Sequence, residues 1–289
     1  MSDPEERIGN ESAAPPRAPG PRLGIGRTAE VFTWGDAEII KLLRPGSPER
    51  WGELEAAIAA RVDATGLAAP HFLGVERVDG RYGLVFERVT GPSMLDRLTR
   101  RPWRVDRLAR GFAALHTRIN ETDGAGLPSH VANVRAAIER AAEPLGAMRL
   151  DAALRRLDEV AAGSVVCHGD MHPGNVILSS KGPIVIDWLT AGAGPAEADV
   201  ARTLFLLLGS DIPTAYPPIQ RALISGIRRR FTGTYLRHYR RLRSVDAHQL
   251  YLWRLLVLAA RMSEGIEAER ASLLVRIDAE VDRAGTWSR

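Results

Sequence analysis

The chain has 289 residues, of which 45% are hydrophobic and 26% charged, the composition of an ordinary soluble globular protein with a sizeable core. Its single cysteine, Cys167, excludes an intramolecular disulfide framework, and the apolar run around it is expected to bury an inert thiol. No apolar run approaches the roughly 18 residues of a membrane span, and the N-terminus lacks the apolar core of a secretory signal, so we expect a cytoplasmic protein without a membrane partner.

The formal net charge is +4, and the densest basic cluster is RRRFTGTYLRHYRRLR at residues 228–243. Within it, Phe231, Tyr235 and Tyr239 recur at intervals of four residues, which places the aromatic rings on one face of a helix. This pattern predicts a core-facing aromatic stripe with a solvated basic back. Nucleic-acid binding is the alternative interpretation of the cluster, but no further motif accompanies it, so we expect no nucleic-acid partner.

The N-terminal part of the chain predicts a small sheet with one helix. Residues 1–20, rich in Pro, Ala, Gly and Glu, are expected to form a disordered tail. Residues 23–43 alternate short apolar runs with glycine turns and predict two or three antiparallel strands. The segment 47–66 carries apolar residues every four positions and predicts an amphipathic helix, and 71–89 predicts a hairpin that turns at Val78-Asp79-Gly80-Arg81.

The rest of the chain is mainly helical in pattern. Helices are predicted over 93–120, 131–146 and 150–162, then a short β segment over 164–187, and helices again from Ala196 onward. The predicted fold class is therefore α+β, with a small antiparallel-sheet lobe at 21–88 and a larger, mainly helical lobe at 89–289. A cleft between two such lobes is the expected ligand site.

The run VVCHGDMHPGNVIL at 165–178 carries most of the chemically reactive side chains of this region. His168, Asp170 and His172 alternate along it, and on a strand they would share one face and could ligate zinc, as in a zinc hydrolase. The following Pro173-Gly174 breaks such a strand, and no second cluster of ligands stands nearby. A zinc site is therefore the weaker interpretation of this run.

A phosphoryl-transfer loop is the stronger interpretation. In kinases a catalytic-loop Asp accepts the proton of the attacking hydroxyl, and an Asn in D-x-x-x-x-N spacing binds a metal ion. Asp170 and Asn175 have this spacing, and the predicted hairpin over 176–187 ends in Asp187. Three oxygen-bearing side chains of this kind suit Mg²⁺, which bridges phosphate oxygens.

The motif HGDMHPGNVIL followed by IVIDW resembles that of the aminoglycoside phosphotransferase and choline kinase-like family of small-molecule kinases. The resemblance extends from about residue 23 to the last helices. It implies a bilobal protein-kinase-like fold and an ATP-dependent enzyme that moves the γ-phosphoryl group to a hydroxyl of a small molecule. It further implies ATP, or GTP, as the donor, Mg²⁺ as the cofactor, and a monomer or weak dimer.

The same resemblance implies roles for the residues of the loop. Asp170 corresponds to the catalytic base, and Asn175 and Asp187 correspond to the Mg²⁺ ligands. Asp199 resembles the helix aspartate that braces the catalytic loop, although a carboxylate in a first helical turn is also favoured by the helix dipole. His168 is expected to hydrogen-bond backbone around the loop.

A rare lysine points to the nucleotide. Lys41 and Lys181 are the only lysines among 39 basic residues, and Lys181 lies in a polar turn. Lys41 resembles the strand lysine that contacts the α- and β-phosphates, where a compact ammonium serves better than the planar fork of arginine. Glu55 is the best candidate for its helix partner, and Glu53 is the second candidate.

Two further segments resemble nucleotide-binding parts of the family. Residues 24–29 resemble the loop that covers the phosphates, through Gly26 and Thr28, although such glycines also suit an ordinary β-turn. Glu87 and Val89 fall in the segment that resembles the hinge, whose backbone hydrogen-bonds the adenine.

The acceptor is expected to be a small hydroxylated molecule, because the short segment 188–198 leaves little chain for docking a peptide. An aminoglycoside-like antibiotic, an amino sugar, a sugar or an amino alcohol would all fit this description. Aminoglycosides are polycations and need carboxylates, whereas the C-terminal helices are rich in arginine. The acidic residues of that region that could contribute are Asp246, Glu264, Glu267 and Glu269. A catalytically idle nucleotide-binding protein of the same fold is the main rival function.

Overall fold

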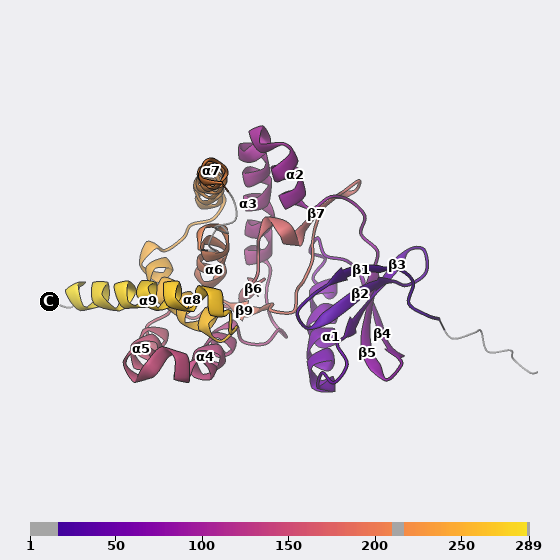
Figure 1. Cartoon of the computed structure of the whole chain (residues 1–289), viewed down its shortest axis with the longest axis horizontal. Coiled ribbons are helices and arrows are strands. Elements are labelled where there is room, and N and C mark those ends of the chain that lie inside the picture. Colours follow the sequence, from indigo (N-terminus) through magenta and orange to yellow (C-terminus); the bar gives the residue numbers. More distant parts are fainter. Residues whose placement is uncertain (1–16, 210–216, 288–289) are drawn as a thin grey trace, which may run out of the picture. The chain divides into compact units, whose positions relative to one another are not determined.

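The computed structural model describes residues 17–209 and 217–287, so the predicted tail lies outside the described residues as far as residue 16. The chain divides into two compact units, Met1–Gly52 with Phe72–Arg88 and Glu53–His71 with Val89–Arg289. Both are drawn in Figure 1. The helix α1 (Glu49–Ala64) falls mainly in the second unit, whereas the lobe boundaries drawn from the sequence, which remain a prediction, assign it to the first.

The first unit is a five-stranded antiparallel sheet in the order β1-β2-β3-β5-β4. Its strands are β1 (Arg22–Ile25), β2 (Ala29–Thr33), β3 (Glu38–Leu43), β4 (Phe72–Val78) and β5 (Arg81–Glu87). Trp34, Ile40, Leu42 and Val85 form its small core. The hairpin of β4 and β5 turns at Asp79 and Gly80, both with positive φ, as the Asp-Gly pair predicts.

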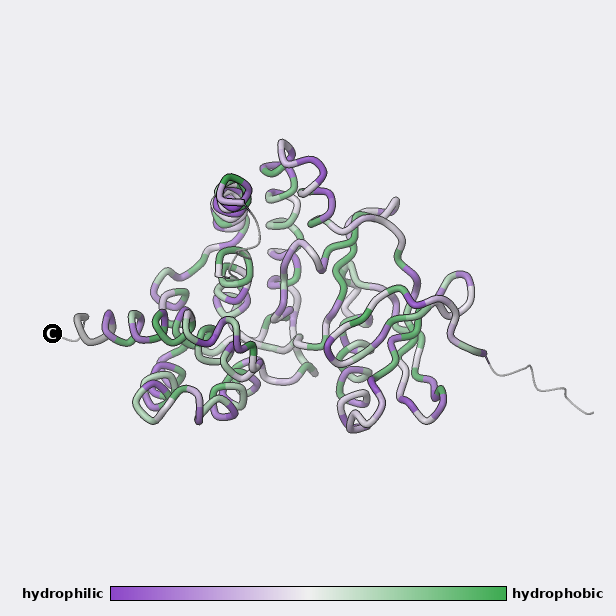
Figure 2. Tube along the Cα trace, viewed as in Figure 1, coloured by the Kyte–Doolittle hydropathy of each residue, from purple (hydrophilic) through white to green (hydrophobic). Residues whose placement is uncertain are grey.

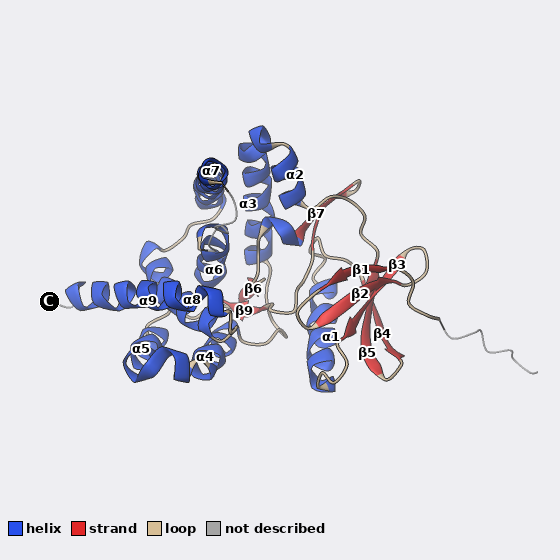
Figure 3. Cartoon of the chain, viewed as in Figure 1, coloured by secondary structure: helices blue, strands red, loops and turns tan. Residues whose placement is uncertain are grey.

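The second unit is built mainly of helices, coloured blue in Figure 3. After α1 these are α2 (Met94–Arg100), α3 (Val105–Glu121), α4 (His130–Arg140), α5 (Ala142–Asp158), α6 (Ala196–Leu208), α7 (Pro218–Leu242), α8 (Ala247–Met262) and α9 (Glu267–Trp287), with the 3₁₀ turns η1 (Pro102–Arg104) and η2 (Pro173–Asn175). Two small strand pairs complete it, β6 (Val165–Cys167) with β9 (Gly192–Gly194) and β7 (Val176–Ser179) with β8 (Gly182–Val185). These elements confirm the predicted α+β fold class.

The strand β9 is missing from the sequence prediction because it has almost no side chains to form a pattern. A Cβ added at Gly192 would lie 3.1 Å from the backbone nitrogen of His130, and one at Gly194 would lie 2.8 Å from the His130 side chain. The two glycines therefore let this strand approach α4 closely while it pairs with β6.

The core of the second unit confirms the predicted aromatic stripe. Phe231, Tyr235 and Tyr239 of α7 are at most 1% exposed. Tyr235 contacts the rings of Phe112 and His116 on α3, which joins the two helices through aromatic packing. The arginines of α7 lie on its other faces, and Figure 2 shows both apolar and polar residues on this helix.

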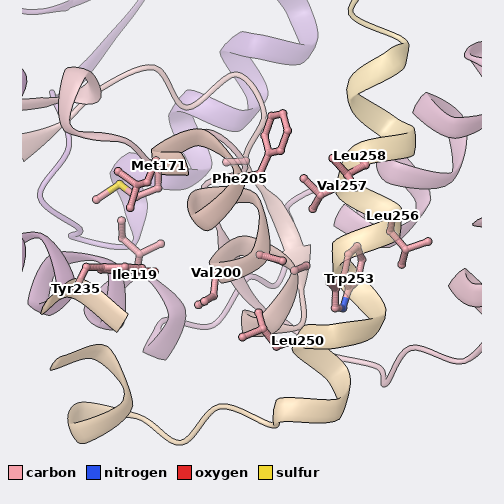
Figure 4. Close-up of a cluster of buried hydrophobic side chains, with 14 of the residues drawn as sticks. Ile119, Met171, Val200, Phe205, Tyr235, Leu250, Trp253, Leu256, Val257 and Leu258 are labelled. Atoms are coloured by element: carbon pink, nitrogen blue, oxygen red, sulfur yellow. The ribbon is translucent and has the colours of Figure 1, made fainter. Parts of the chain in front are cut away.

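The helix α8 contributes many side chains to the apolar core of the unit. Figure 4 shows its residues Leu250, Trp253 and Val257 in the core, with Val200 and Phe205 of α6 nearby. Despite this apolar character, no helix among the described residues is long and apolar enough to cross a membrane.

Two glycine-to-alanine substitutions test whether the close contact at Gly91 requires a glycine. Gly91 has φ of 148°, and an added Cβ would lie 2.5 Å from the carbonyl oxygen of Leu178. We expect Gly91→Ala to lower the free energy of unfolding by about 1–3 kcal/mol. Gly111 lies in α3 with nothing within 4 Å of an added Cβ, so Gly111→Ala should raise it by about 0.5–1 kcal/mol. Urea denaturation at neutral pH measures both, and an unchanged stability of Gly91→Ala would contradict this account.

Candidate active site

The residues from His168 to Asn175 form a loop between β6 and β7 that ends in η2. Gly169 has φ of 77°, and a Cβ there would lie 2.6 Å from the carbonyl oxygen of Thr190, so only glycine fits without strain. Pro173 opens the 3₁₀ turn, and the Nδ1 atom of His172 accepts a hydrogen bond from the Gly174 nitrogen at 3.0 Å. The run is therefore a tightly constrained loop.

The structure brings Asp170 and Asn175 into direct contact. The Asn175 side-chain amide donates to the backbone oxygen of Asp170 at 3.0 Å and to its carboxylate Oδ2 at 3.2 Å. Because both bonds use the amide nitrogen, the Oδ1 of Asn175 is the atom oriented to serve a cation. The Asp170 side chain is 28% exposed, which leaves its carboxylate accessible to a small molecule.

Asp187 is held beside this loop through its neighbour Ile186. The Ile186 nitrogen donates to the Asn175 carbonyl at 2.9 Å, and the Ile186 carbonyl lies 3.1 Å from the Nε2 of His168. Asp187 itself is exposed and has φ of 64°, a left-handed conformation that is strained for a residue with a Cβ. The oxygen donors of Asn175 and Asp187 are the hard ligands that suit Mg²⁺, so the residues fit such an ion.

A buried carboxylate supports the loop from behind. Asp199, in the first turn of α6, has no exposed surface. Its Oδ2 accepts from the His168 backbone nitrogen at 2.8 Å, and its Oδ1 accepts from the Gly169 nitrogen at 2.8 Å. The expected brace is thus confirmed. Burial raises the pKa of Asp199, but the charge of His116 and its hydrogen bond lower it by more, so the pKa lies below the usual range.

The side chains of α3 complete the environment of Asp199. The Nε2 of His116 lies 3.0 Å from the Asp199 Oδ2, and the Asn120 amide donates to the same oxygen at 3.0 Å. The hydroxyls of Tyr235 and Tyr239 bind His116 and Asn120 in turn, at 2.8 and 2.7 Å. Sequence reasoning missed Asn120, although its place four residues after His116, on the buried face of one helix, is a usable signal.

The zinc interpretation of this run is wrong. Both ring nitrogens of His168 are engaged, because Nδ1 accepts from the Asp170 nitrogen at 3.1 Å while Nε2 binds the Ile186 carbonyl. Burial lowers the pKa of His168, which keeps the ring neutral. In the described ranges no group of three His, Cys, Asp or Glu side chains could hold a metal ion. Burial also raises the pKa of the Cys167 thiol, which makes it a poor nucleophile.

Arg202 is a second residue beside the loop that sequence reasoning missed. It follows Asp199 by three positions on α6, so both side chains face the loop. Its Nε donates to the Gly169 carbonyl at 3.3 Å, and its Nη2 lies 3.7 Å from the Asp170 carboxylate. The same Nη2 donates to Glu264 at 2.8 Å, which links the catalytic loop to the segment between α8 and α9.

The first unit carries four of the predicted nucleotide ligands. Lys41 lies in β3 opposite Val31 and Leu84, in the middle of the sheet. Gly26 and Thr28 lie in the turn between β1 and β2, which the Gly26 nitrogen closes by donating to the Ala29 carbonyl at 2.8 Å. Glu87 ends β5 opposite Glu38. Their roles toward a nucleotide remain predictions.

The second unit carries the other two. Glu55 is only 5% exposed on α1, whereas Glu53 is exposed, and this burial favours Glu55 as the functional carboxylate. Val89 lies half-buried in the segment that follows β5. The partnership of Glu55 with Lys41 and the role of Val89 at a hinge also stay predictions.

Comparison with known proteins agrees with this geometry. The model of a family described as the phosphotransferase enzyme family matches residues 22–245. The chain belongs to this family. It is accordingly a small-molecule kinase of the aminoglycoside phosphotransferase and choline kinase-like type, as the loop motif predicted. No curated protein sequence matches the chain.

Solved structures of the phosphotransferase family share the fold at low sequence identity. A thermostable mutant of aminoglycoside phosphotransferase APH(4)-Ia has a TM-score of 0.60 and 16% identity, covering 93% of this chain and 95% of that one. A choline/ethanolamine kinase family protein from Mesorhizobium loti has a TM-score of 0.55 and 14% identity, covering 91% and 92%. The amicoumacin kinase hAmiN, in complex with AMP-PNP, Ca²⁺ and Ami, has a TM-score of 0.56 and 15% identity, covering 90% and 87%. They confirm the protein-kinase-like fold.

The buried Asp199 predicts a specific dependence of stability on acid. A carboxylate whose folded pKa is depressed stabilises the protein above its unfolded pKa of about 3.9 and loses that contribution as the pH falls through the folded pKa. We expect Asp199→Asn to lower the free energy of unfolding at pH 7 by about 3–5 kcal/mol. Below about pH 4 the stability of the wild type should fall more steeply than that of the variant, because the amide does not titrate.

Asp106 provides the control for this measurement. A hydrogen bond from Arg230 lowers the pKa of Asp106 to about 2, but its side chain is 35% exposed. Asp106→Asn should remove the contribution of Asp106 to the fall of stability in acid. Because salt screens exposed charges, about 0.5 M NaCl should weaken this contribution of Asp106 and leave the contribution of Asp199 nearly unchanged. Urea denaturation as a function of pH gives both slopes, and equal acid slopes for wild type and Asp199→Asn would rule out the assigned role.

Proposed function

We propose that the chain transfers the γ-phosphoryl group of ATP to a hydroxyl group of a small molecule, with Asp170 as the general base. The observation that carries this proposal is the contact of Asp170 with Asn175 in one loop, with Asp187 tied to the same loop through Ile186. These are the three side chains that phosphoryl transfer requires at one place.

Asp170 acts by position as well as by basicity. Its carboxylate accepts the proton of the acceptor hydroxyl while that oxygen attacks the γ-phosphorus, and ADP leaves. The Asn175 amide fixes one carboxylate oxygen, and Arg202 lies beside the other. A carboxylate held in this way needs little reorganisation when the acceptor binds, and positioning of this kind supplies a large part of the acceleration in phosphoryl transfer.

Asn175 and Asp187 would hold Mg²⁺ through their side-chain oxygens. The ion, when bound, supplies positive charge that neutralises the phosphate oxygens. Asn175 is oriented to bind such an ion, because its amide nitrogen donates to Asp170 and its Oδ1 is not used in these bonds. The left-handed backbone of Asp187 is the kind of strain that folded proteins retain at functional positions.

We assign the donor nucleotide to the sheet unit and the segments that flank it. In this proposal Lys41 contacts the α- and β-phosphates, and Glu55 orients that ammonium. The turn with Gly26 and Thr28 covers the phosphates, and the backbone at Glu87 and Val89 binds the purine of ATP or GTP. We further propose that the chain acts in the cytoplasm, where Mg-ATP is available, as a monomer or weak dimer.

The idle nucleotide-binding protein is the alternative within the same fold. It has no use for the catalytic carboxylate, yet the structure supports that carboxylate with Asn175 and keeps it accessible. Hydrolysis of Mg-ATP without acceptor, measured beside ATP binding by thermal shift, separates the two: the idle protein would bind ATP and leave it intact.

Asp170→Asn tests the proposed base. The amide cannot accept the proton, so we expect loss of transfer by at least about 10²–10⁴-fold in kcat. ATP binding should be retained, because Asp170 is assigned no contact with the nucleotide. Phosphate gain by mass spectrometry in a screen of hydroxylated metabolites and antibiotics measures transfer. Asp151→Asn, on the exposed surface of α5, is the matched control and should keep full activity. Near-wild-type turnover in Asp170→Asn would overturn the assignment.

A further inference from the structure

The carboxylates that a polycationic acceptor would need are already engaged. Glu264 receives Arg202 at 2.8 Å and Arg261 at 2.5 Å. Glu269 receives Arg261 through two hydrogen bonds, at 2.8 and 2.9 Å. Burial raises the pKa of Glu264, but these arginines lower it by more, so it remains ionised in its pairs. Neither carboxylate is presented as a bare negative charge to an incoming amine.

The other two acidic candidates of the C-terminal region serve the helices. Asp246 caps α8 by accepting from the backbone nitrogens of His248 and Gln249 at 2.8 and 3.1 Å. Glu267, whose side chain is 85% exposed, lies 3.7 Å from Arg270 on α9. Three of the four acidic residues that the sequence offers for an aminoglycoside are therefore engaged within the fold, and Glu267 is exposed in a weak surface pair.

Three arginines gather around Phe205 on α6. The guanidinium groups of Arg202, Arg261 and Arg276 lie 5.7, 5.7 and 5.2 Å from the ring centroid of Phe205 on α6. Arg276 also donates to the Gly209 carbonyl at 3.1 Å, at the end of the same helix. The aromatic ring thus holds three cations together, and Arg202 extends from this group to within 3.7 Å of Asp170.

A second group of arginines stands on α2, which packs against η2 of the catalytic loop. Pro92, Arg97, Arg100 and Arg101 line a cavity of about 140 Å³ there. The acidic residue of this helix, Asp96, is engaged in the capping box with Ser93. The loop therefore contacts two arginine-bearing helices, α2 through η2 and α6 through Arg202.

The position of Arg202 restricts what the acceptor can carry. The reacting hydroxyl must lie within hydrogen-bonding distance of Asp170, about 2.6–3.2 Å. A substituent close to that hydroxyl then falls within a few ångströms of the Arg202 guanidinium. Coulomb's law favours a carboxylate or phosphate over an ammonium group at such a distance from a guanidinium, and the negative charges of Glu264, at 2.8 Å, and Asp170, at 3.7 Å, reduce this preference. The planar fork of arginine also matches these anions in geometry.

Building on the proposed phosphotransferase function, we propose that the acceptor is a hydroxylated compound with a carboxylate or phosphate group near the reacting hydroxyl. Arg202 is the residue that selects it over aminoglycosides and other polycations. In the reaction, the acceptor oxygen forms a bond to the γ-phosphorus of ATP, the bond from that phosphorus to the bridging oxygen of ADP breaks, and Asp170 takes the hydroxyl proton.

The test uses acceptors that share a scaffold and differ in charge. One set is glucosamine, glucose, glucuronate and glucose 6-phosphate, a second is ethanolamine, ethylene glycol, glycolate and 2-hydroxyethyl phosphate, and kanamycin represents the polycations. Phosphate gain is measured by mass spectrometry with the full chain and Mg-ATP. We expect kcat/KM for an anionic member to exceed that of its amine by at least about tenfold. The carboxylate and phosphate members show which anion the site takes.

Variants at the loop provide the second readout. Arg202→Met should raise KM for the anionic acceptor about tenfold or more and leave KM for the neutral one nearly unchanged, and Arg202→Lys should restore part of the preference. Glu264→Gln should strengthen the preference, since it removes a negative charge from Arg202 without altering that arginine. Arg149→Met is the control, because it breaks a comparable pair, with Asp278, between α5 and α9.

The outcomes are distinct. The inference would be overturned if kanamycin or the amines had the highest kcat/KM, or if anionic, neutral and cationic acceptors had equal values. It would also be overturned if the preference for anions were unchanged in both Arg202→Met and Glu264→Gln. The proposed function is judged separately by acceptor-free hydrolysis of Mg-ATP and its loss in Asp170→Asn. Hydrolysis that depends on Asp170, together with a preference for amines, would leave that function standing and refute only the anionic acceptor.

Discussion

The buried carboxylate of Asp199 is the interaction on which the catalytic loop depends. It accepts hydrogen bonds from two consecutive backbone nitrogens, at His168 and Gly169, and from the side chains of His116 and Asn120. A fully buried charge is tolerated only when it is paired and hydrogen-bonded, and here the partners come from α3 and from the loop. Because the loop supplies half of these donors, its backbone has little freedom to move without exposing an unsatisfied charge.

This backbone carries the candidate site residues Asp170 and Asn175. Asn175 fixes the Asp170 carboxylate, and Ile186 links Asn175 and His168 to the strained residue Asp187. Arg202, one helical turn after Asp199, then adds a positive charge beside Asp170. The same helix thus supplies both the carboxylate that holds the loop backbone and the guanidinium that lies beside Asp170.

The fold was predictable because its local signals agree with one another. The Asp79-Gly80 turn, the apolar periodicity of α1 and the aromatic repeat of α7 each specify one element. The strand β9 was not predictable, because Gly192 and Gly194, which allow close approach to His130, have no side chains that could form an alternating hydrophobic pattern. The predicted helix end at residue 146 coincides with a kink within α5, where Gly146 has φ of 72°, but the break at Ala141 between α4 and α5 was not predicted.

The sequence by itself determined the class of chemistry, because the spacing of Asp170 and Asn175 lies within one short loop whose geometry is local. It also indicated Asp199, through the family resemblance. Only the tertiary structure decided that Asn120 shares the Asp199 carboxylate, that Glu264 and Glu269 are paired with arginines, and that Arg202 lies beside Asp170. These contacts join residues far apart in the chain, and a charge count along the sequence cannot tell a carboxylate that faces a ligand from one already paired.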